Sequence, residues 1–138
     1  MDESGFDATI GGLNTVLNLR QMSQNVTSSN IANADTPGYK AKKIEFEGAL
    51  RDALGASEHL KPQASNPRHI AHSAELPVYP EIYEDPNDIE SLDGNTVDRN
   101  AEMVKLAENQ LLYDAAVELL KKKMGMLKYA ISEGGGSH

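Results

Sequence analysis

The strongest periodic pattern in the chain lies toward its C-terminal end, between residues 94 and 131. Positions recur there in alternating steps of three and four, a spacing typical of a helix with a heptad seam. These positions are Met103, Leu106, Gln110, Tyr113, Val117, Leu120, Met124, Leu127 and Ile131. All of them except Gln110 are apolar or aromatic. The pattern predicts one long helix over this region.

Two further apolar series lie on other faces of the same predicted helix. Leu112, Leu119 and Met126 repeat every seven residues, as do Val104 and Leu111. A helix that is apolar on two faces has to bury both. One face can pack on another helix of the chain. The second is covered either by neighbouring subunits or by the middle of the chain in a small hairpin, and the pattern alone leaves both open.

A second long helix is predicted from about residue 6 to residue 33, where no proline occurs. Phe6 begins an apolar stripe in this region, and an amphipathic helix of this kind needs a partner surface in water. We expect the two terminal helices to pair. The predicted helix-packing seam consists of Ile10, Leu13, Leu17, Met103, Leu106, Tyr113, Val117, Leu120, Met124 and Leu127.

A sharply specified turn follows the N-terminal helix. Pro37 presets φ for the second position of a turn, and Gly38 tolerates the positive φ that a type II turn needs next. Side chains before the turn can bond backbone groups that a helix end leaves unpaired: Asn30, Asn33, Asp35 and Thr36.

The middle of the chain, residues 41–93, is acidic and rich in proline. It holds five of the six prolines, which excludes long helices and central strands: Pro62, Pro67, Pro77, Pro80 and Pro86. A short helix can run from Phe46 to Leu54, and residues 76–83 can form at most an edge strand. The predicted fold is therefore mainly α, with paired long N- and C-terminal helices, coiled-coil-like, around an irregular middle. Residues 1–40, 41–93 and 94–131 form its three parts, and 132–138 are a flexible tail or a cloning remnant.

Composition narrows the possible functions. The 138 residues are 39% hydrophobic and 5% aromatic, which is lean for a globular core, so we expect parts to order only on assembly. A formal charge of −8 argues against nucleic acid or an anionic membrane as the main partner. The sequence has no stretch of about 20 apolar residues, so we expect no direct insertion into a membrane. We also expect no cleavable secretory signal.

Catalytic chemistry is not predicted. The absence of cysteine excludes disulfides, thiol catalysis and cysteine-ligated zinc. His69 and His72 are three residues apart, but the nearby Pro67 favours a solvated loop over a metal pair. We therefore predict no enzyme activity, no catalytic or metal-binding residues and no cofactor.

The block at residues 28–40 resembles the N-terminal signature of the flagellar basal-body rod and hook family, Asn-x-Ala-Asn-x-x-Thr-x-Gly-Tyr. Residues 6–14 and 19–21 before it, and residues 93–98 and 102–113 near the other end, are similar to the same family. The signature positions, together with the intervening proline, form a predicted assembly motif: Asn30, Asn33, Thr36, Pro37, Gly38 and Tyr39.

The resemblance implies a structural subunit whose terminal helices pair and stack into the rod that transmits torque across the periplasm. It implies other rod proteins, further copies of the chain and the adaptor between rod and membrane ring as partners, with export through the flagellar type III apparatus. Hook and distal-rod relatives carry a large β-rich domain between the termini, so the short middle favours the proximal rod. The alternative is a cytoplasmic helical adaptor or chaperone-like protein of the export system.

Overall fold

The computed structural model of the chain describes residues 3–59 and 79–135. Within them the predicted mainly helical fold is confirmed, with a short irregular middle and little strand. The elements in chain order are α1 (Glu3–Ala32), β1 (Lys42–Ile44), α2 (Phe46–His59), β2 (Ile82–Glu84) and α3 (Arg99–Gly134).

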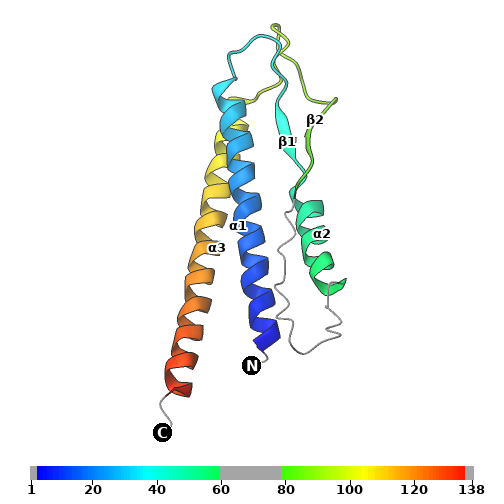
Figure 1. The fold of residues 1–138 in the computed structure, drawn as a ribbon. Helices are drawn as coiled ribbons and strands as arrows, with labels where there is room; N and C mark the ends of the chain where they lie inside the picture. The colour runs from blue at the N-terminus through cyan, green and yellow to red at the C-terminus, as the bar shows by residue number, and fades with distance from the viewer. Residues whose placement is uncertain (1–2, 60–78, 136–138) are drawn as a thin grey trace.

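The two terminal helices lie side by side and antiparallel, so both ends of the chain are at the same end of the molecule (Figure 1). At 1.5 Å per residue, α1 is about 45 Å long and α3 about 54 Å. α3 begins at Arg99 rather than at residue 94 and continues to Gly134 rather than ending at residue 131. The side chain of Asp98 caps it by accepting the Ala101 N–H at 3.1 Å.

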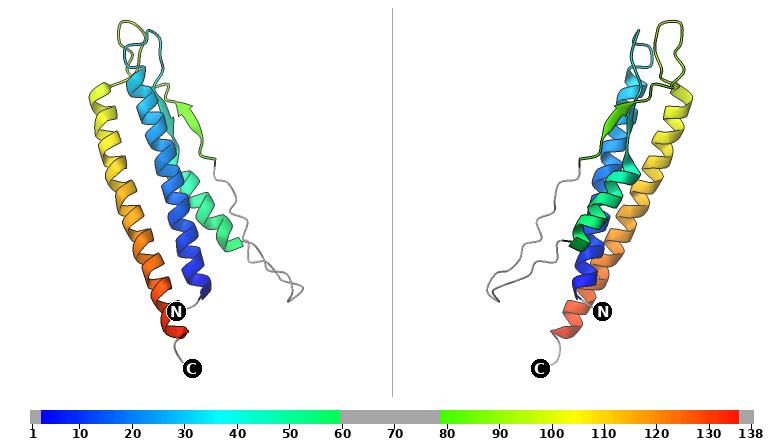
Figure 2. Two further views of the ribbon diagram at one scale, coloured as in Figure 1. Left: turned by 60° about the vertical axis from the view of Figure 1, so that its left-hand side comes forward. Right: turned by 90° about the vertical axis from the view of Figure 1, so that its right-hand side faces the viewer.

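α1 is the central element of the fold. It contacts α3 on one side and α2 and β1 on the other, whereas α3 contacts only α1 among the described elements. Figure 2 shows this layering, with the strands and α2 on the far side of α1 from α3. The described part of the middle segment therefore does not cover the second apolar face of α3.

The middle segment forms a small β element and a helix, as predicted. β1 and β2 pair antiparallel, with Lys42 opposite Glu84 and Ile44 opposite Ile82. The predicted short helix is α2, which has 14 residues. Of the residues expected to form an edge strand, 76–78 lie outside the described residues.

The buried set is small and unusually polar. Its apolar members are Leu19, Ala41, Ala49, Ala116 and Pro80. Its polar members are Thr27, Asn30, Asn95, Glu102 and Asn109. Buried polar side chains are tolerated only where they are hydrogen-bonded, so the positions of these five residues locate the specific contacts of the fold. None of the described helices combines the length and apolarity needed to cross a membrane.

Candidate functional site

The signature turn and the segment that precedes α3 fold against each other at one end of the helix pair (Figure 1). We call residues 30–42 together with residues 91–98 the helix-end clasp. It joins parts of the chain that are about 60 positions apart. All six residues of the predicted assembly motif lie in it.

Two glycines with positive φ stand against each other in the clasp. Gly38 has the positive φ predicted for it, +73°, and the Tyr39 N–H donates to the Thr36 carbonyl at 3.2 Å. Gly94 has φ +78°, and a Cβ there would lie 3.5 Å from the Cα of Gly38. The Gly38 N–H donates to the Asp93 carbonyl at 2.8 Å. The two turns therefore hold each other through their backbones.

Asn30 makes four hydrogen bonds through its side chain and is only 1% exposed. Its amide nitrogen donates to the Lys42 carbonyl at 2.8 Å and to Oε2 of Glu102 at 3.0 Å. Its amide oxygen accepts the Lys42 N–H at 2.9 Å and the Tyr39 hydroxyl at 3.1 Å. A carboxamide has two N–H donors and two acceptor lone pairs. Asn30 is thus fully satisfied, and it ties α1 to β1, to the turn and to α3.

Asn95 bonds to the turn that follows α1. Its amide nitrogen lies 2.8–3.0 Å from the carbonyl oxygens of Asn33, Ala34 and Thr36. Its oxygen accepts the Val97 N–H at 2.7 Å. α1 ends at Ala32, so these three carbonyls belong to the turn that follows the helix, and Asn95 holds that turn against the segment before α3. Asn95 was not among the predicted site residues, although it lies in the block at residues 93–98.

The remaining motif residues divide between internal contacts and the surface. Asn33 donates to the Ser29 carbonyl at 2.9 Å and accepts the Thr36 hydroxyl at 3.2 Å. Thr36, Pro37 and Gly38 are exposed at the tip of the turn. Their predicted role in assembly stays a prediction.

The contact face of α3 differs from the predicted seam. Leu106, Tyr113, Val117, Leu120 and Leu127 are partly buried, as are Ile10, Leu13 and Leu17 of α1. Met103 and Met124, however, are 56% and 51% exposed. The most buried positions are instead Glu102, Asn109 and Ala116. Each precedes by one residue a position of the predicted seam pattern (103, 110 and 117), so α3 is rotated slightly from the predicted orientation. Within this chain Met103 and Met124 are not buried by the α1–α3 contact, and their contact with other copies stays a prediction.

Asn109 and Arg20 form the second polar contact between α1 and α3. Asn109 donates its amide to the Arg20 carbonyl at 2.8 Å, and its oxygen lies 3.4 Å from Nη1 of the Arg20 guanidinium. The guanidinium also lies over the Phe46 ring of α2, 4.0 Å from the ring centre. Burial lowers the pKa of Arg20, and its Nε is buried with no hydrogen-bond partner among the described residues. Arg20 thus links all three helices.

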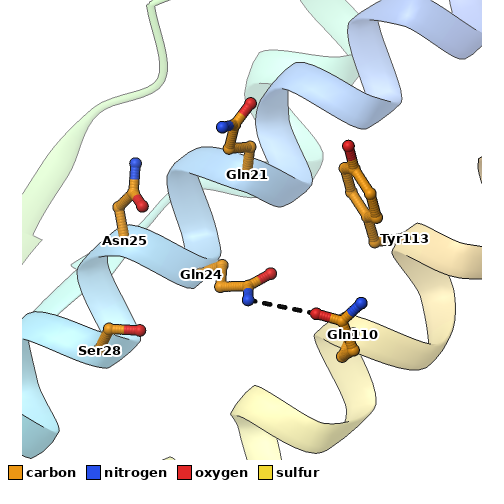
Figure 3. A pocket seen from close by; sticks show the side chains of 6 residues that line it. All are labelled: Gln21, Gln24, Asn25, Ser28, Gln110 and Tyr113. Carbon is orange, nitrogen blue, oxygen red and sulfur yellow. Dashed lines mark hydrogen bonds between the residues drawn. The ribbon is translucent and has the colours of Figure 1, made fainter.

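A polar groove of about 320 Å³ lies along the same helix pair (Figure 3). In it, Gln24 of α1 donates to Gln110 of α3 at 3.2 Å. The lining side chains are uncharged: Gln21, Gln24, Asn25, Ser28, Gln110 and Tyr113. They offer hydrogen bonds but neither a nucleophile with a base nor a charged group. No cluster of three or more possible metal ligands occurs in residues 3–59 and 79–135, and His69 and His72 lie outside them.

The acidic loop after β2 is attached to β1 by a lysine. Lys43 Nζ lies 3.0 Å from Asp85 and 2.6 Å from Asp88. These carboxylates raise the pKa of Lys43, Asp88 more than Asp85. The pKa of Asp85 is lowered, first by the Asn87 N–H and then by Lys43. Lys40 makes a similar attachment to Glu90.

Large apolar side chains are exposed on α3 and near the clasp. On the face of α3 turned away from α1, the exposed set is Val104, Leu111, Leu112, Leu119, Met126 and Tyr129. In the acidic loop, Ile89 and Leu92 are almost fully exposed. Apolar side chains gathered on one side of a helix are typical of an interaction site.

Comparison with known proteins identifies the family. Residues 14–40, which include most of α1 and the signature turn, match the family described as flagella basal body rod protein. The flagellar basal body rod protein FlgB of Bacillus subtilis is 35% identical over 129 residues, which cover 94% of this chain and 97% of that protein. The FlgB proteins of Escherichia coli and Salmonella typhimurium are 33% and 36% identical, and each match covers 94% of this chain and 96% of the relative. Because the similarity extends over nearly the whole of each relative, the chain belongs to the FlgB family of flagellar basal body rod proteins.

Proposed function

We propose that the chain is a non-enzymatic structural subunit of the proximal flagellar rod and that it assembles through α1 and α3. The relatives that the chain matches over nearly their whole length are named as rod proteins. The short segment between the terminal helices supports the proximal rod over the hook or the distal rod. Each copy would contribute its helix pair to the wall of the rod.

The observation that carries this proposal is the uncovered apolar face of α3. Among the described elements, α3 contacts only α1, and the residues it buries there are Glu102, Asn109 and Ala116. Its Leu111, at 71% exposure, represents the side that faces away. Burying apolar surface contributes about 25 cal/mol of free energy per Å², so covering this face with neighbouring subunits would stabilise the assembly.

The proposed partners follow from the same reasoning. Further copies of the chain, other rod proteins and the adaptor between the rod and the membrane ring would cover the exposed helix faces. The subunit would span part of the periplasm in the basal body, after export by the flagellar type III apparatus. The alternative of a cytoplasmic helical adaptor gains no support, because the relatives compared above are named as rod proteins.

A test of this function places charges on the exposed face without touching the buried set. Leu112 and Leu119 lie seven residues apart on α3 and are 47% and 54% exposed. The double variant Leu112→Asp/Leu119→Asp should keep the helical circular dichroism of the parent chain. In cells that lack the parent gene, it should be absent from purified basal bodies, and the cells should not swim.

A matched control makes the same change of net charge on the other side of the helix. Lys128 is exposed and lies about 180° around the helix from Leu119. Lys128→Asp changes the net charge as much as the double variant does and should be incorporated better. Normal basal-body content of the double variant at normal protein level would overturn assembly through this face. Complete basal bodies in cells without the gene would overturn the structural role itself.

A further inference from the structure

Two of the three side chains that α3 buries most fully are polar. They are Glu102 and Asn109, with Ala116 as the third, and each of the three immediately precedes a position of the predicted seam pattern. Five apolar members of that pattern are still partly buried, but Met103 and Met124 are exposed, although burial gain rises with apolar area and favours covering them. Some other interaction therefore fixes the rotation of this helix.

We propose that Glu102 and Asn109 are positioning residues that fix the register and the rotation of α3 on α1, so that the apolar face of α3 is turned outward. This inference rests on the proposed function for its cellular consequence, since an outward apolar face matters when neighbours assemble on it. The role of the two residues is to favour one pairing of the helices over the alternatives, and not to increase the stability of the chain.

The two buried polar contacts between α1 and α3 are both made only in the observed register. Glu102, 5% exposed, accepts from Asn30 at 3.0 Å and from Lys105 at 2.8 Å. Asn109, 4% exposed, meets the carbonyl and the guanidinium of Arg20. Sliding α3 by one heptad so that Val117 takes the place of Gln110 would put Asn109 opposite Asn30 and Ala116 opposite Arg20. Glu102 would then lose Asn30, and the Arg20 guanidinium would lose its amide partner. Such unpaired groups are strongly unfavourable, whereas an apolar seam tolerates a slide of one heptad.

The two contacts together fix both axial position and rotation. They lie seven residues apart on α3, about 10 Å along the axis, and use α1 residues ten positions apart. Asn30 is in addition bonded to β1 and Tyr39, so the register of the helix pair is set from the helix-end clasp. Single buried polar groups are known to specify register in coiled coils at a cost in stability.

The experiment combines stability, register and assembly in one set of variants. Asn109→Leu, alone and with Glu102→Leu, replaces the buried polar groups by apolar groups of similar volume. Each substitution removes one partner and leaves Asn30 or the Arg20 guanidinium without it, which costs stability. We expect an unfolding midpoint below that of the parent, and a decrease of about tenfold or more in basal-body incorporation, because the choice between registers is a difference of free energies.

Register can be read directly because the chain has no cysteine. Gln24 and Gln110 are in contact, so Gln24→Cys/Gln110→Cys should react with a short bismaleimide in the native register. Gln24→Cys/Val117→Cys should react only after a slide of one heptad. In the otherwise unchanged chain we expect the first cross-link alone, and in the leucine variants comparable amounts of both.

A single cross-link and normal incorporation in the leucine variants would overturn the proposal. Loss of stability with the native cross-link retained would also overturn it, because the two residues would then only stabilise. If the leucine variants do not fold, Asn109→Ala, which removes the amide without adding bulk, decides between these outcomes by the same cross-links. Absence of the parent chain from basal bodies would refute the proposed function, while the cross-links would still test the register.

Discussion

Asn30 and Glu102, 72 positions apart in the chain, share a hydrogen bond of 3.0 Å between side chains that are both almost completely buried. The bond joins the last turn of α1 to the first turn of α3. The Glu102 carboxylate also accepts from Lys105, so its charge is compensated at the edge of the contact. This pair marks the place where the helix pair and the helix-end clasp meet.

Replacing Asn30 by Ala should lower the free energy of unfolding by about 2–4 kcal/mol, because it removes four hydrogen bonds, among them those to Oε2 of Glu102 and to the backbone of Lys42. Urea unfolding followed by circular dichroism measures this. The control is Asn25→Ala on an exposed position of the same helix, with a change below about 0.5 kcal/mol. Equal effects of the two variants would show that the Asn30 network does not stabilise the fold.

Replacing Gly38 by Val should destabilise the chain by about 1–2 kcal/mol, because φ is +73° there and left-handed backbone is costly for L-residues. No atom lies within 4 Å of a Cβ built on Gly38, so the cost comes from the backbone and not from a clash. Gly38→Asn should cost less, since Asn tolerates this region. We expect export to proceed and basal-body incorporation of the Val variant to decrease. Equal unfolding midpoints for Val and Gly would contradict this reading of the turn.

Acid should release the loop after β2 from β1. The pKa of Asp85 is lowered by the Asn87 N–H and by Lys43, so its contribution is complete above its ordinary pKa and is lost as the pH falls through the lowered value. The Glu45 N–H, which donates to the Glu81 carbonyl at 2.9 Å, reports the strand pairing by its NMR chemical shift. Asp85→Asn should remove this acid transition, and Glu84→Gln, whose side chain makes no described ion pair, should retain it. An unchanged transition in Asp85→Asn would assign it to another group.

Amide exchange in the isolated chain should be slowest around Leu19 to Asn30 of α1 and Glu102 to Ala116 of α3, where the buried residues lie. It should be fast at the two helix ends away from the clasp, because helices fray where they lack burial. Mass spectrometry of the dilute chain measures both, with the urea-unfolded chain as the reference. Uniformly slow exchange along α1 and α3 would show that the pair is complete without neighbours.

Several features of the fold were predictable because local sequence determines them. The heptad spacing through Leu106, Tyr113 and Leu120 predicted α3, since helix formation along an apolar stripe depends on residues a few positions apart. The Pro37-Gly38 pair predicted the turn, because its requirement for a positive φ is met within the turn itself. The short helix α2 was predicted for the same reason.

The polar contacts were not predictable, because polar side chains on a helix ordinarily face solvent. Whether Asn109 is buried depends on Arg20, which is 89 positions away. Asn95 likewise finds its acceptors in the turn that follows α1. The one available signal was the spacing of seven between Glu102, Asn109 and Ala116, which repeats with the heptad but carries no apolar side chain larger than Ala.

The antiparallel pairing of the first and last helices also delays folding during synthesis, because α1 has to wait for α3. During synthesis α1 is made first, but Asn109, its partner at Arg20, follows 89 positions later. At about 5–20 residues per second this leaves several seconds in which α1 has no partner helix. Contacts between distant parts of a chain also close slowly. The order of helices along the sequence thus keeps a newly made chain open for another protein to bind before it can close on itself.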